Sequence, residues 1–470
     1  MDAIGSKLCP NCERLQRQVD ALLERVAQLE AELAVARKNS ANSSKPPSSD
    51  MAKPPRSAPN NGQVKGKRKR GGQPGHPRHE RAPFAPDEID QAWDYSFSTC
   101  PDCGGELKPS DAPPRVLQQV DVIASPLRVT EHRGQPCFCR RCQKTHYAPL
   151  PEDVRRAGLI GPRLTAVVGF LKGGCHCSFS TIRKFLRDVL GVTISRSQLR
   201  NVCAKVADSL DTPYQQLLSA LPEQDVLNVD ETGHKEYQQR MWTWCFRASL
   251  FTLFKIDPSR GSEVLLEVLG REFHGVLGCD YFSAYRKYMG ECSVQLQFCL
   301  AHLLRDVRFL TEHPHSRTRA YGQRVLQAMR ELFEVVHRRQ EYTAGAFRVA
   351  LGNAGDELWA QAVYRVPAMK EARNLAKRFE KHGEAYLRFI TTPGIEPTNN
   401  LAEQAIRFVV IDRHITQGSR SDGGRRWLER IWTTMATCAQ QGRSGFTFLV
   451  KAVEAHFQGA PAPVLLENTS

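Results

Sequence analysis

The chain has 470 residues, more than one compact core needs and enough for two or three domains. Its 65 Lys and Arg residues exceed its 50 Asp and Glu residues, so its formal net charge of +15 favours a polyanionic partner such as nucleic acid. No run of about 18 apolar residues and no signal-peptide core occurs, which excludes membrane-spanning and secreted classes and predicts a cytoplasmic protein. The 15 cysteines are then expected to be metal ligands or core residues, because disulfides are rare in a reducing compartment.

The first predicted element is a helix over residues 13–38. It carries apolar residues at spacings of 4, 3, 4, 3 and 4, namely Leu15, Val19, Leu22, Val26, Leu29 and Leu33. This a/d repeat predicts a short parallel coiled coil, and hence a homodimer or higher oligomer. An amphipathic helix that folds back on its own domain is the alternative. The preceding Cys9 and Cys12 provide at most half of a zinc site.

Residues 39–86 are rich in Pro, Ser, Gly and Asn and contain almost no residues that form a core. Such a segment buries too little apolar surface to offset its chain entropy, so we expect a flexible linker. Its basic residues cluster at Lys67, Arg68, Lys69 and Arg70. These side chains are predicted to contact DNA phosphates without sequence specificity. A linker that only improves solubility is the alternative.

Residues 87–150 contain two CxxC pairs, Cys100 with Cys103 and Cys139 with Cys142. Four thiolates that converge tetrahedrally predict a structural Zn²⁺ site in a zinc-ribbon-like domain, with β-like segments between the pairs over 115–133. All four coordination positions would be filled, so this metal would stabilise the domain and not catalyse. Cys137 is an alternative ligand or has no role at the site.

Residues 151–222 are predicted to be helical. One helix ends near Gly191 and another begins near Ser195, with Arg196 and Arg200 early in the second. Two helices joined by a short turn are compatible with a DNA-binding helix-turn-helix. A helical hairpin that serves only as a scaffold has the same pattern.

The pattern becomes β-rich after residue 222. An apolar strand at 225–235 carries Asp230, two strands follow within 241–257, a helix covers 261–269, and a further apolar strand ends at Asp280. Three antiparallel strands, a helix and a strand beside the first are the order of a ribonuclease H-like fold. The two carboxylates would then lie side by side and repel unless divalent cations lie between them.

A third carboxylate is expected from the helix of "EPTNNLAEQAIRFVVIDRH" (396–414), which carries Glu403. The alternative is that Glu403 only interacts with the helix dipole and with Arg407 at i,i+4. Asn399 and Asn400 are predicted to cap this helix and so to set the direction of the carboxylate. Charged amphipathic helices before it predict a helical insertion over about 313–392.

The helix after the strand at 294–298 carries His302 and Arg305 at i,i+3. They could hydrogen-bond a phosphate or a flanking nucleotide, or they could satisfy carbonyls at the end of the sheet or pair with Asp306. Cys299 with His302 is the weaker interpretation as a zinc site, since no second pair matches it. Two further acids are interpreted as helpers or salt-bridge partners: Glu231 and Asp412.

Several motifs resemble those of transposases of the insertion sequence 66 family, which are bacterial mobile-element enzymes. The resemblance covers most of the chain and includes "NSSKPPSSD" (42–50), "KRGGQPGH" (69–76), "VDETG" (229–233), "GCDYFSAY" (278–285), "CLAHLLRD" (299–306) and "PTNNLAEQAIR" (397–407). It implies an Asp-Asp-Glu site in which Asp230, Asp280 and Glu403 bind Mg²⁺ or Mn²⁺ and His302 assists. It also favours a phosphate or nucleotide contact by Arg305 in a nucleoid-associated enzyme, while Arg407 could pair with Glu403 or face the DNA backbone.

The function that the resemblance implies is a DNA transposase that cleaves element ends and joins them to target DNA, with possible help from element-encoded accessory proteins. A structure-selective nuclease of the same fold and a zinc-containing DNA-binding regulator without catalysis are the alternatives. The expected architecture is multidomain, with an α/β catalytic domain that carries a helical insertion. The expected parts are a CxxC and coiled-coil helix (1–38), a basic linker (39–86), a zinc-binding domain (87–150), a helical DNA-binding segment (151–222), a ribonuclease H-like domain (223–415) and a C-terminal helical segment (416–470).

Overall fold

The computed structural model describes residues 10–36, 83–99, 101–106, 114, 116–120, 122–123 and 126–466. The chain divides into two compact units, of which Arg56–Glu131 is one and Met1–Pro55 with His132–Ser470 is the other. We call Arg56–Glu131 the first unit and the rest of the chain the second unit. The described residues of the first unit contain a short 3-10 helix, η2 (Pro86–Glu88), and no strand. The prediction of β-like segments over 115–133 is therefore wrong for the described residues of that stretch.

Helix α1 (Pro10–Ala36) confirms the predicted N-terminal helix. Its six a/d side chains are all exposed in the single chain, with exposed fractions from 47% to 65%. An apolar stripe of this kind is stable in water only when something covers it. Pairing with a second chain as a coiled coil stays a prediction.

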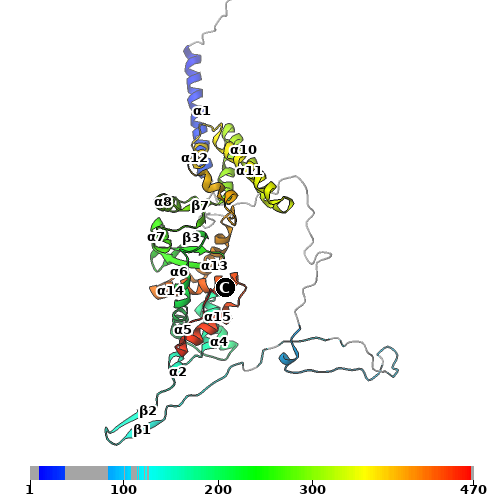
Figure 1. Ribbon diagram of the computed structural model, residues 1–470, viewed down its shortest axis with the longest axis vertical. Helices are drawn as coiled ribbons and strands as arrows, with labels where there is room; N and C mark the ends of the chain where they lie inside the picture. Colours follow the sequence, from blue (N-terminus) through cyan, green and yellow to red (C-terminus); the bar gives the residue numbers. More distant parts are fainter. Residues whose placement is uncertain are drawn as a thin grey trace, which may run out of the picture. The chain divides into compact units, whose positions relative to one another are not determined.

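The second unit contains a five-stranded mixed sheet, shown at the centre of Figure 1. Its strands are β3 (Val226–Glu236), β4 (Gln239–Arg247), β5 (Thr252–Asp257), β6 (Val276–Cys279) and β7 (Gln295–Phe298). The first three are antiparallel, and β6 pairs parallel with β3 on its other side, so the spatial order is β5-β4-β3-β6-β7. Helix α7 (Ser262–Leu269) precedes β6, which confirms the predicted order of strands and helix.

Helices make up most of the second unit. Before the sheet come α2 (Glu152–Ala157), α3 (Pro162–Gly173), α4 (Phe179–Asp188), α5 (Arg196–Ser209) and α6 (Asp211–Ala220). After β6 come α8 (Ser283–Cys292), α9 (Leu300–Thr311), α10 (Ser316–His337), the 3-10 helix η3 (Arg339–Glu341), α11 (Ala344–Val363), α12 (Lys370–Thr391), α13 (Asn400–Thr416), α14 (Asp422–Gln440) and α15 (Gly445–Gln458). One continuous hydrophobic core extends through these elements from Ile160 to Leu465. None of the described helices is long and apolar enough to cross a membrane.

Edge strand β5 is covered by α14, whose side chains bond to the strand backbone. The amides of Thr252, Phe254 and Ile256 donate to Thr437, Thr433 and Glu429 at 3.2, 3.0 and 2.7 Å. Four residues of helix rise about 6 Å and two residues of strand about 6.7 Å, so the two ladders run nearly in step. Helix α14 therefore prevents this edge of the sheet from pairing with another strand.

The opposite edge strand, β7, is covered by α12 of the predicted helical insertion. Arg388 donates to the carbonyl of Leu296 at 3.1 Å, and the side chain of Gln297 accepts from the amide of Phe389 at 2.8 Å. Figure 1 shows α10, α11 and α12 near this end of the sheet, and α5 and α15 near the other. The sheet thus lies between two groups of helices.

Candidate active site

Asp230 and Asp280 lie in register on adjacent parallel strands. The ladder pairs Asn228 with Gly278, so two residues further on Asp230 in β3 stands beside Asp280, which directly follows β6. Side chains at equivalent positions of parallel strands point to the same face. The amide of Glu231 donates to Oδ1 of Asp230 at 2.9 Å, and the amide of Phe282 donates to Oδ1 of Asp280 at 2.8 Å.

The two aspartates carry the electrostatic strain that the sequence led us to expect. Burial raises the pKa of Asp230 well above its ordinary range, and the charges of Glu231, Asp280 and Glu403 raise it further. Burial also raises the pKa of Asp280, while His302 acts in the opposite direction. Each aspartate nevertheless keeps part of its surface exposed. The site is therefore acidic, poorly solvated and still accessible from outside.

Glu403 lies in the first turn of α13, and Asn399 holds the start of that helix against β3. Nδ2 of Asn399 donates to the carbonyl of Val229 at 2.7 Å, and its Oδ1 accepts from Asn228 at 3.0 Å. A Cβ on Gly278 would come within 2.5 Å of the Asn228 side chain, so glycine is needed there. These bonds attach the helix of one carboxylate to the strand of another.

The predicted capping by Asn399 and Asn400 is wrong in its mechanism. Asn399 is the N-cap residue, but its side chain makes no capping hydrogen bond because it is engaged with β3. Asn400 is exposed and is the first residue of the helix. The direction of Glu403 is therefore set by a tertiary contact and not by a local cap.

The basic side chains within 4.0 Å of Glu403, among the residues that the structure describes, are those of His302 and Arg305. His302 Nδ1 lies 3.5 Å from Oε1, and Arg305 Nη2 lies 3.7 Å from Oε2. Both come from α9, one turn apart, as the i,i+3 spacing predicted. Arg407 is exposed and forms no ion pair with Glu403. The alternative interpretation, in which the two side chains pair at i,i+4, is therefore wrong.

From the sequence alone, a metal site at Cys299 and His302 is the weaker interpretation, but the structure brings a third potential ligand to these two residues. Among the described residues, Cys299, His302 and Glu403 form the one group of three with ligand atoms all within 4.8 Å of one another. The carboxylates of Asp230, Asp280 and Glu403 do not meet that distance together. The Cys299–His302 spacing was visible in "CLAH", but their third partner is about a hundred residues away in the sequence.

Glu231 and Asp412 are salt-bridge partners, as predicted. Oε1 of Glu231 accepts from Arg260 at 2.7 and 2.9 Å, and its Oε2 accepts from the Tyr285 hydroxyl at 2.5 Å. Asp412 lies 3.2 Å from His176. Both acids are therefore engaged by other side chains of the protein.

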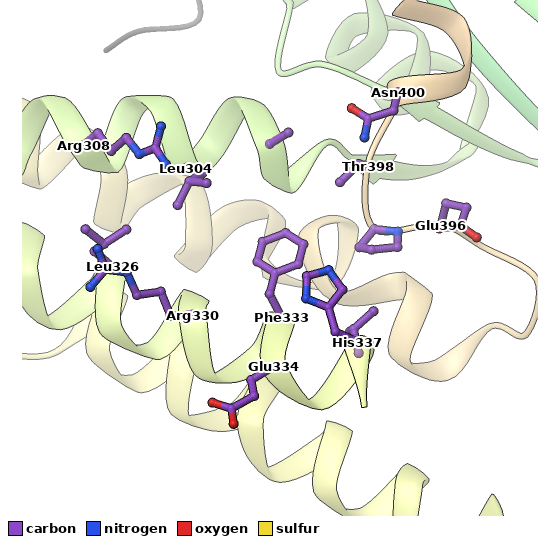
Figure 2. A pocket seen from close by; sticks show the side chains of 13 residues that line it. Leu304, Arg308, Leu326, Arg330, Phe333, Glu334, His337, Glu396, Thr398 and Asn400 are labelled. Carbon is purple, nitrogen blue, oxygen red and sulfur yellow. The ribbon is translucent and has the colours of Figure 1, made fainter. Parts of the chain in front are cut away.

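A pocket of about 690 Å³ adjoins the site. Figure 2 shows Phe333 and His337 pointing from α10 toward the segment with Glu396 and Thr398 that leads into α13. Leu304 and other residues of α9 line its opposite wall. Helix α9 thus presents one face to the pocket and the adjacent face, with His302 and Arg305, to Glu403.

The structure describes some of the predicted DNA-binding residues and not others. Arg196 and Arg200 are exposed at the start of α5, after the turn from α4 that the sequence predicted, and the hydroxyl of Ser195 caps that helix at 3.1 Å. Arg196 also donates to Ser180 at 3.1 Å. The four basic linker residues, Lys67, Arg68, Lys69 and Arg70, lie outside the described residues.

The structure describes three of the four predicted zinc ligands, and these three belong to two different units. Cys100 lies outside the described residues, and Cys103 is exposed in the unit Arg56–Glu131. Cys139 and Cys142 belong to the other unit, where β1 (Pro136–Cys139) and β2 (Lys144–Tyr147) form a hairpin around them. Cys139 is the last residue of β1 and Cys142 lies in the turn before β2, and the zinc site stays a prediction.

The fold and the site together define an α/β protein with an acidic site where adjacent parallel strands end. A family model described as "Transposase IS66 family" matches residues 157–426, and the chain belongs to this family. A second model, "Family of unknown function (DUF6444)", matches residues 6–82. The resemblance noted from the motifs is thereby confirmed.

Two curated relatives come from Sinorhizobium fredii (strain NBRC 101917 / NGR234). The chain is 24% identical to "Uncharacterized protein y4qI" over 375 residues, which cover 73% of this chain and 68% of the relative. It is 22% identical to "Uncharacterized protein y4hP" over 378 residues, which cover 73% of this chain and 67% of that relative. Their names add no activity to what the family states.

Proposed function

We propose that this protein is a DNA transposase that cleaves the ends of an insertion sequence and joins them to target DNA. Family membership supports a transposase function in general. The observation that carries the finer proposal is the in-register placement of Asp230 and Asp280, with Glu403 attached to the same strand through Asn399. The strand order β5-β4-β3-β6-β7 supports the expected ribonuclease H-like fold, in which such a site would perform phosphodiester chemistry.

The residues fit a divalent cation of the Mg²⁺ or Mn²⁺ type. All three candidate ligands are carboxylates, the donors that such hard cations prefer. The recorded bonds of Asp230 and Asp280 engage Oδ1, so Oδ2 of each is the oxygen available to a cation among the described atoms. Burial, and then the charges of Glu231, Asp280 and Glu403, raise the pKa of Asp230, and a bound cation would offset that repulsion. When bound, such a metal activates an attacking oxygen and stabilises the leaving oxygen of a phosphodiester.

His302 and Arg305 act on the DNA in this proposal. Both side chains are partly exposed and lie beside Glu403. Their N–H groups would donate hydrogen bonds to the non-bridging oxygens of the scissile phosphate, where charge increases in the transition state. The chain would thus orient the phosphate for in-line attack, first by water and then by the freed 3′-hydroxyl of the element.

The remaining predictions complete this proposal. Exposed Arg196, Arg200 and Arg407, with the basic linker, would contact DNA phosphates, which give affinity without specificity. The stripe on α1 would pair two chains and so bring two element ends together. Zn²⁺ bound by the two CxxC pairs would stabilise the zinc-binding domain. The domain boundaries given above and the need for accessory proteins are part of the proposal as well.

One experiment separates this proposal from its alternatives. Purified full-length protein is incubated with element-end DNA, a target plasmid and Mg²⁺ or Mn²⁺. We expect a strand-transfer product that Asp280→Asn or Glu403→Gln abolishes, while DNA binding persists. Cleavage without joining would favour a structure-selective nuclease. Binding without cleavage or joining would favour a zinc-containing regulator.

The zinc prediction is tested separately. Elemental analysis of the full-length protein should find a tightly bound Zn²⁺ at the CxxC pairs, and Cys103→Ser and Cys142→Ser should each contain one Zn²⁺ fewer than wild type. The exposed Cys175, which belongs to neither CxxC pair, provides a matched control. Equal zinc content in all of these variants would refute the four-cysteine site.

A further inference from the structure

The cluster of Cys299, His302 and Glu403 combines three kinds of donor. A thiol sulfur, an imidazole nitrogen and a carboxylate oxygen lie within 4.8 Å of one another. Oε1 of Glu403 is buried, accepts no hydrogen bond from the described residues, and lies 3.5 Å from Nδ1 of His302. This oxygen therefore faces the cluster, while Oε2 faces Arg305.

The three donors come from two helices: Cys299 and His302 from the start of α9, and Glu403 from the start of α13. Cys299 directly follows β7 and is the N-cap residue of α9, which puts His302 one turn further along the helix. The backbone amide of Cys299 donates to the carbonyl of Cys279 at 2.8 Å, which fixes Cys299 at the end of the sheet. The amide of Asn399 donates to its sulfur at 3.2 Å, so the start of the Glu403 helix is attached to Cys299 as well.

The geometry is close to what a tetrahedral ion requires. With metal–sulfur and metal–nitrogen distances of about 2.3 and 2.0 Å, neighbouring ligand atoms lie roughly 3.3 to 3.6 Å apart. The distance between His302 and Glu403 already meets this value. Cys299 is 2% exposed, and burial raises the pKa of its thiol, so a metal ion would have to displace the thiol proton.

We propose that Cys299, His302 and Glu403 bind a borderline-soft transition ion of the Zn²⁺ type, and that this binding inhibits the enzyme. Mixed sulfur, nitrogen and oxygen donors select such an ion over Mg²⁺, which prefers oxygen. Binding releases the thiol proton of Cys299 to solvent and forms the sulfur–metal bond. The fourth position stays open to water.

Inhibition follows from the shared ligand. Glu403 would serve Mg²⁺ together with Asp230 and Asp280 in one state, and Zn²⁺ together with Cys299 and His302 in the other. An ion bound at the cluster would engage Oε1 of Glu403 and the imidazole of His302, so it would compete with Mg²⁺ for the third carboxylate and would occupy the histidine that is proposed to contact phosphate. This consequence depends on the proposed function, whereas binding at the cluster does not.

The test uses the metal-free, full-length chain. Co²⁺ is added as a spectroscopic substitute for Zn²⁺ to wild type, Cys299→Ser and Cys438→Ser. Serine at 299 keeps an acceptor for the Asn399 amide but is a poor ligand. Cys438 is an equally buried cysteine on α14 outside the cluster and is the matched control. We expect Cys299→Ser to bind one Co²⁺ fewer per chain and to lose the corresponding sulfur-to-cobalt charge-transfer absorption, and Cys438→Ser to match wild type.

A second measurement addresses inhibition. Zn²⁺ is added to the Mg²⁺-dependent cleavage reaction of each variant. Loss of even an outer-shell group weakens metal binding about 10- to 100-fold, so half-inhibition of Cys299→Ser should need at least about tenfold more Zn²⁺ than wild type.

Equal cobalt stoichiometry and spectra in wild type and Cys299→Ser would overturn the site. Equal Zn²⁺ inhibition of the two would overturn the inhibitory role. If the protein cleaves no DNA under any condition, the proposed function fails, but the cobalt titration still decides whether the cluster binds a metal.

Discussion

The side-chain amide of Asn399 donates a hydrogen bond of 2.7 Å to the main-chain carbonyl of Val229, the residue that precedes Asp230. The same asparagine precedes the helix that carries Glu403. One buried side chain therefore connects the backbones of two proposed metal ligands that are far apart in the sequence. Because proposed ligands must be held within a fraction of an ångström, this bond is a sensitive point of the site.

Asn399→Ala should reduce DNA cleavage more than its effect on stability explains. It leaves the Val229 carbonyl and the Asn228 amide without their partner, which costs about 1 to 3 kcal/mol. We expect a decrease in cleavage rate of about 10- to 100-fold because α13 loses its attachment to β3. Urea unfolding and single-turnover cleavage measure the two effects. The exposed Asn400→Ala is the control, and equal rates in both variants would contradict the positioning role.

Divalent metal should stabilise the wild-type protein and not its aspartate variants. The three carboxylates repel one another, so a cation that binds only the folded state adds about 2.7 kcal/mol at a hundred times its dissociation constant. A thermal shift with Mn²⁺ measures this. Asp280→Asn should have a higher melting temperature than wild type without metal, since repulsion is relieved, and should gain little from Mn²⁺. A full Mn²⁺ response in that variant would place the ion elsewhere.

Arg407→Ala should weaken DNA binding without affecting stability. The side chain is exposed and is not an ion-pair partner of Glu403. If it contacts a phosphate, its loss reduces the slope of log affinity against log salt by about 1 and weakens all DNA sequences similarly. Arg373→Ala removes the same charge from an exposed position on α12 and controls for net charge. The same slope in both variants would argue against a phosphate contact by Arg407.

Thr433→Val should destabilise the protein by about 1 to 3 kcal/mol, because the amide of Phe254 in edge strand β5 then has no acceptor. The substitution preserves shape and removes only the hydroxyl. Thr433→Ser retains the acceptor and should remain closer to wild type. Denaturant unfolding of the two variants provides the comparison, and a Val variant as stable as the Ser variant would show that this bond contributes nothing.

Glu429 should make stability depend on pH. Burial raises the pKa of Glu429 from 4.5 to about 7 in the folded protein, against the opposing effects of the Ile256 amide and of neighbouring cations. Its stabilising proton is fully present below about pH 4.5 and is lost as pH rises through about 7.

Glu429→Gln stays neutral and keeps an acceptor for the Ile256 amide. Between pH 5 and 8, wild type should therefore lose on the order of 2 kcal/mol relative to this variant. Unfolding free energies at the two pH values measure the difference. The exposed Glu267→Gln should show no such effect, and parallel pH profiles of wild type and Glu429→Gln would refute the shifted pKa.

Much of the local structure was predictable because its determinants lie close together in the sequence. Alternating and apolar runs identified β3 to β7, the break near Gly191 separated α4 from α5, and the i,i+3 spacing placed His302 and Arg305 on one side of α9. The placement of Asp230 beside Asp280 followed from the strand order, since parallel strands end at the same edge. The described residues within 115–133 form no strand although their composition is β-like, because composition without a pairing partner does not make a strand.

The sequence by itself determined the strand order and the identity of the acidic residues, because periodicity and short spacings encode both. Only the tertiary structure decided which groups those acids meet. The Asn399–Val229 bond joins residues 170 apart, and the contact of α14 with β5 joins Thr433 and Phe254, 179 apart. Glu403 meets His302 and Cys299 instead of Arg407 for the same reason. Packing of a whole core, and not any local pattern, brings such residues together.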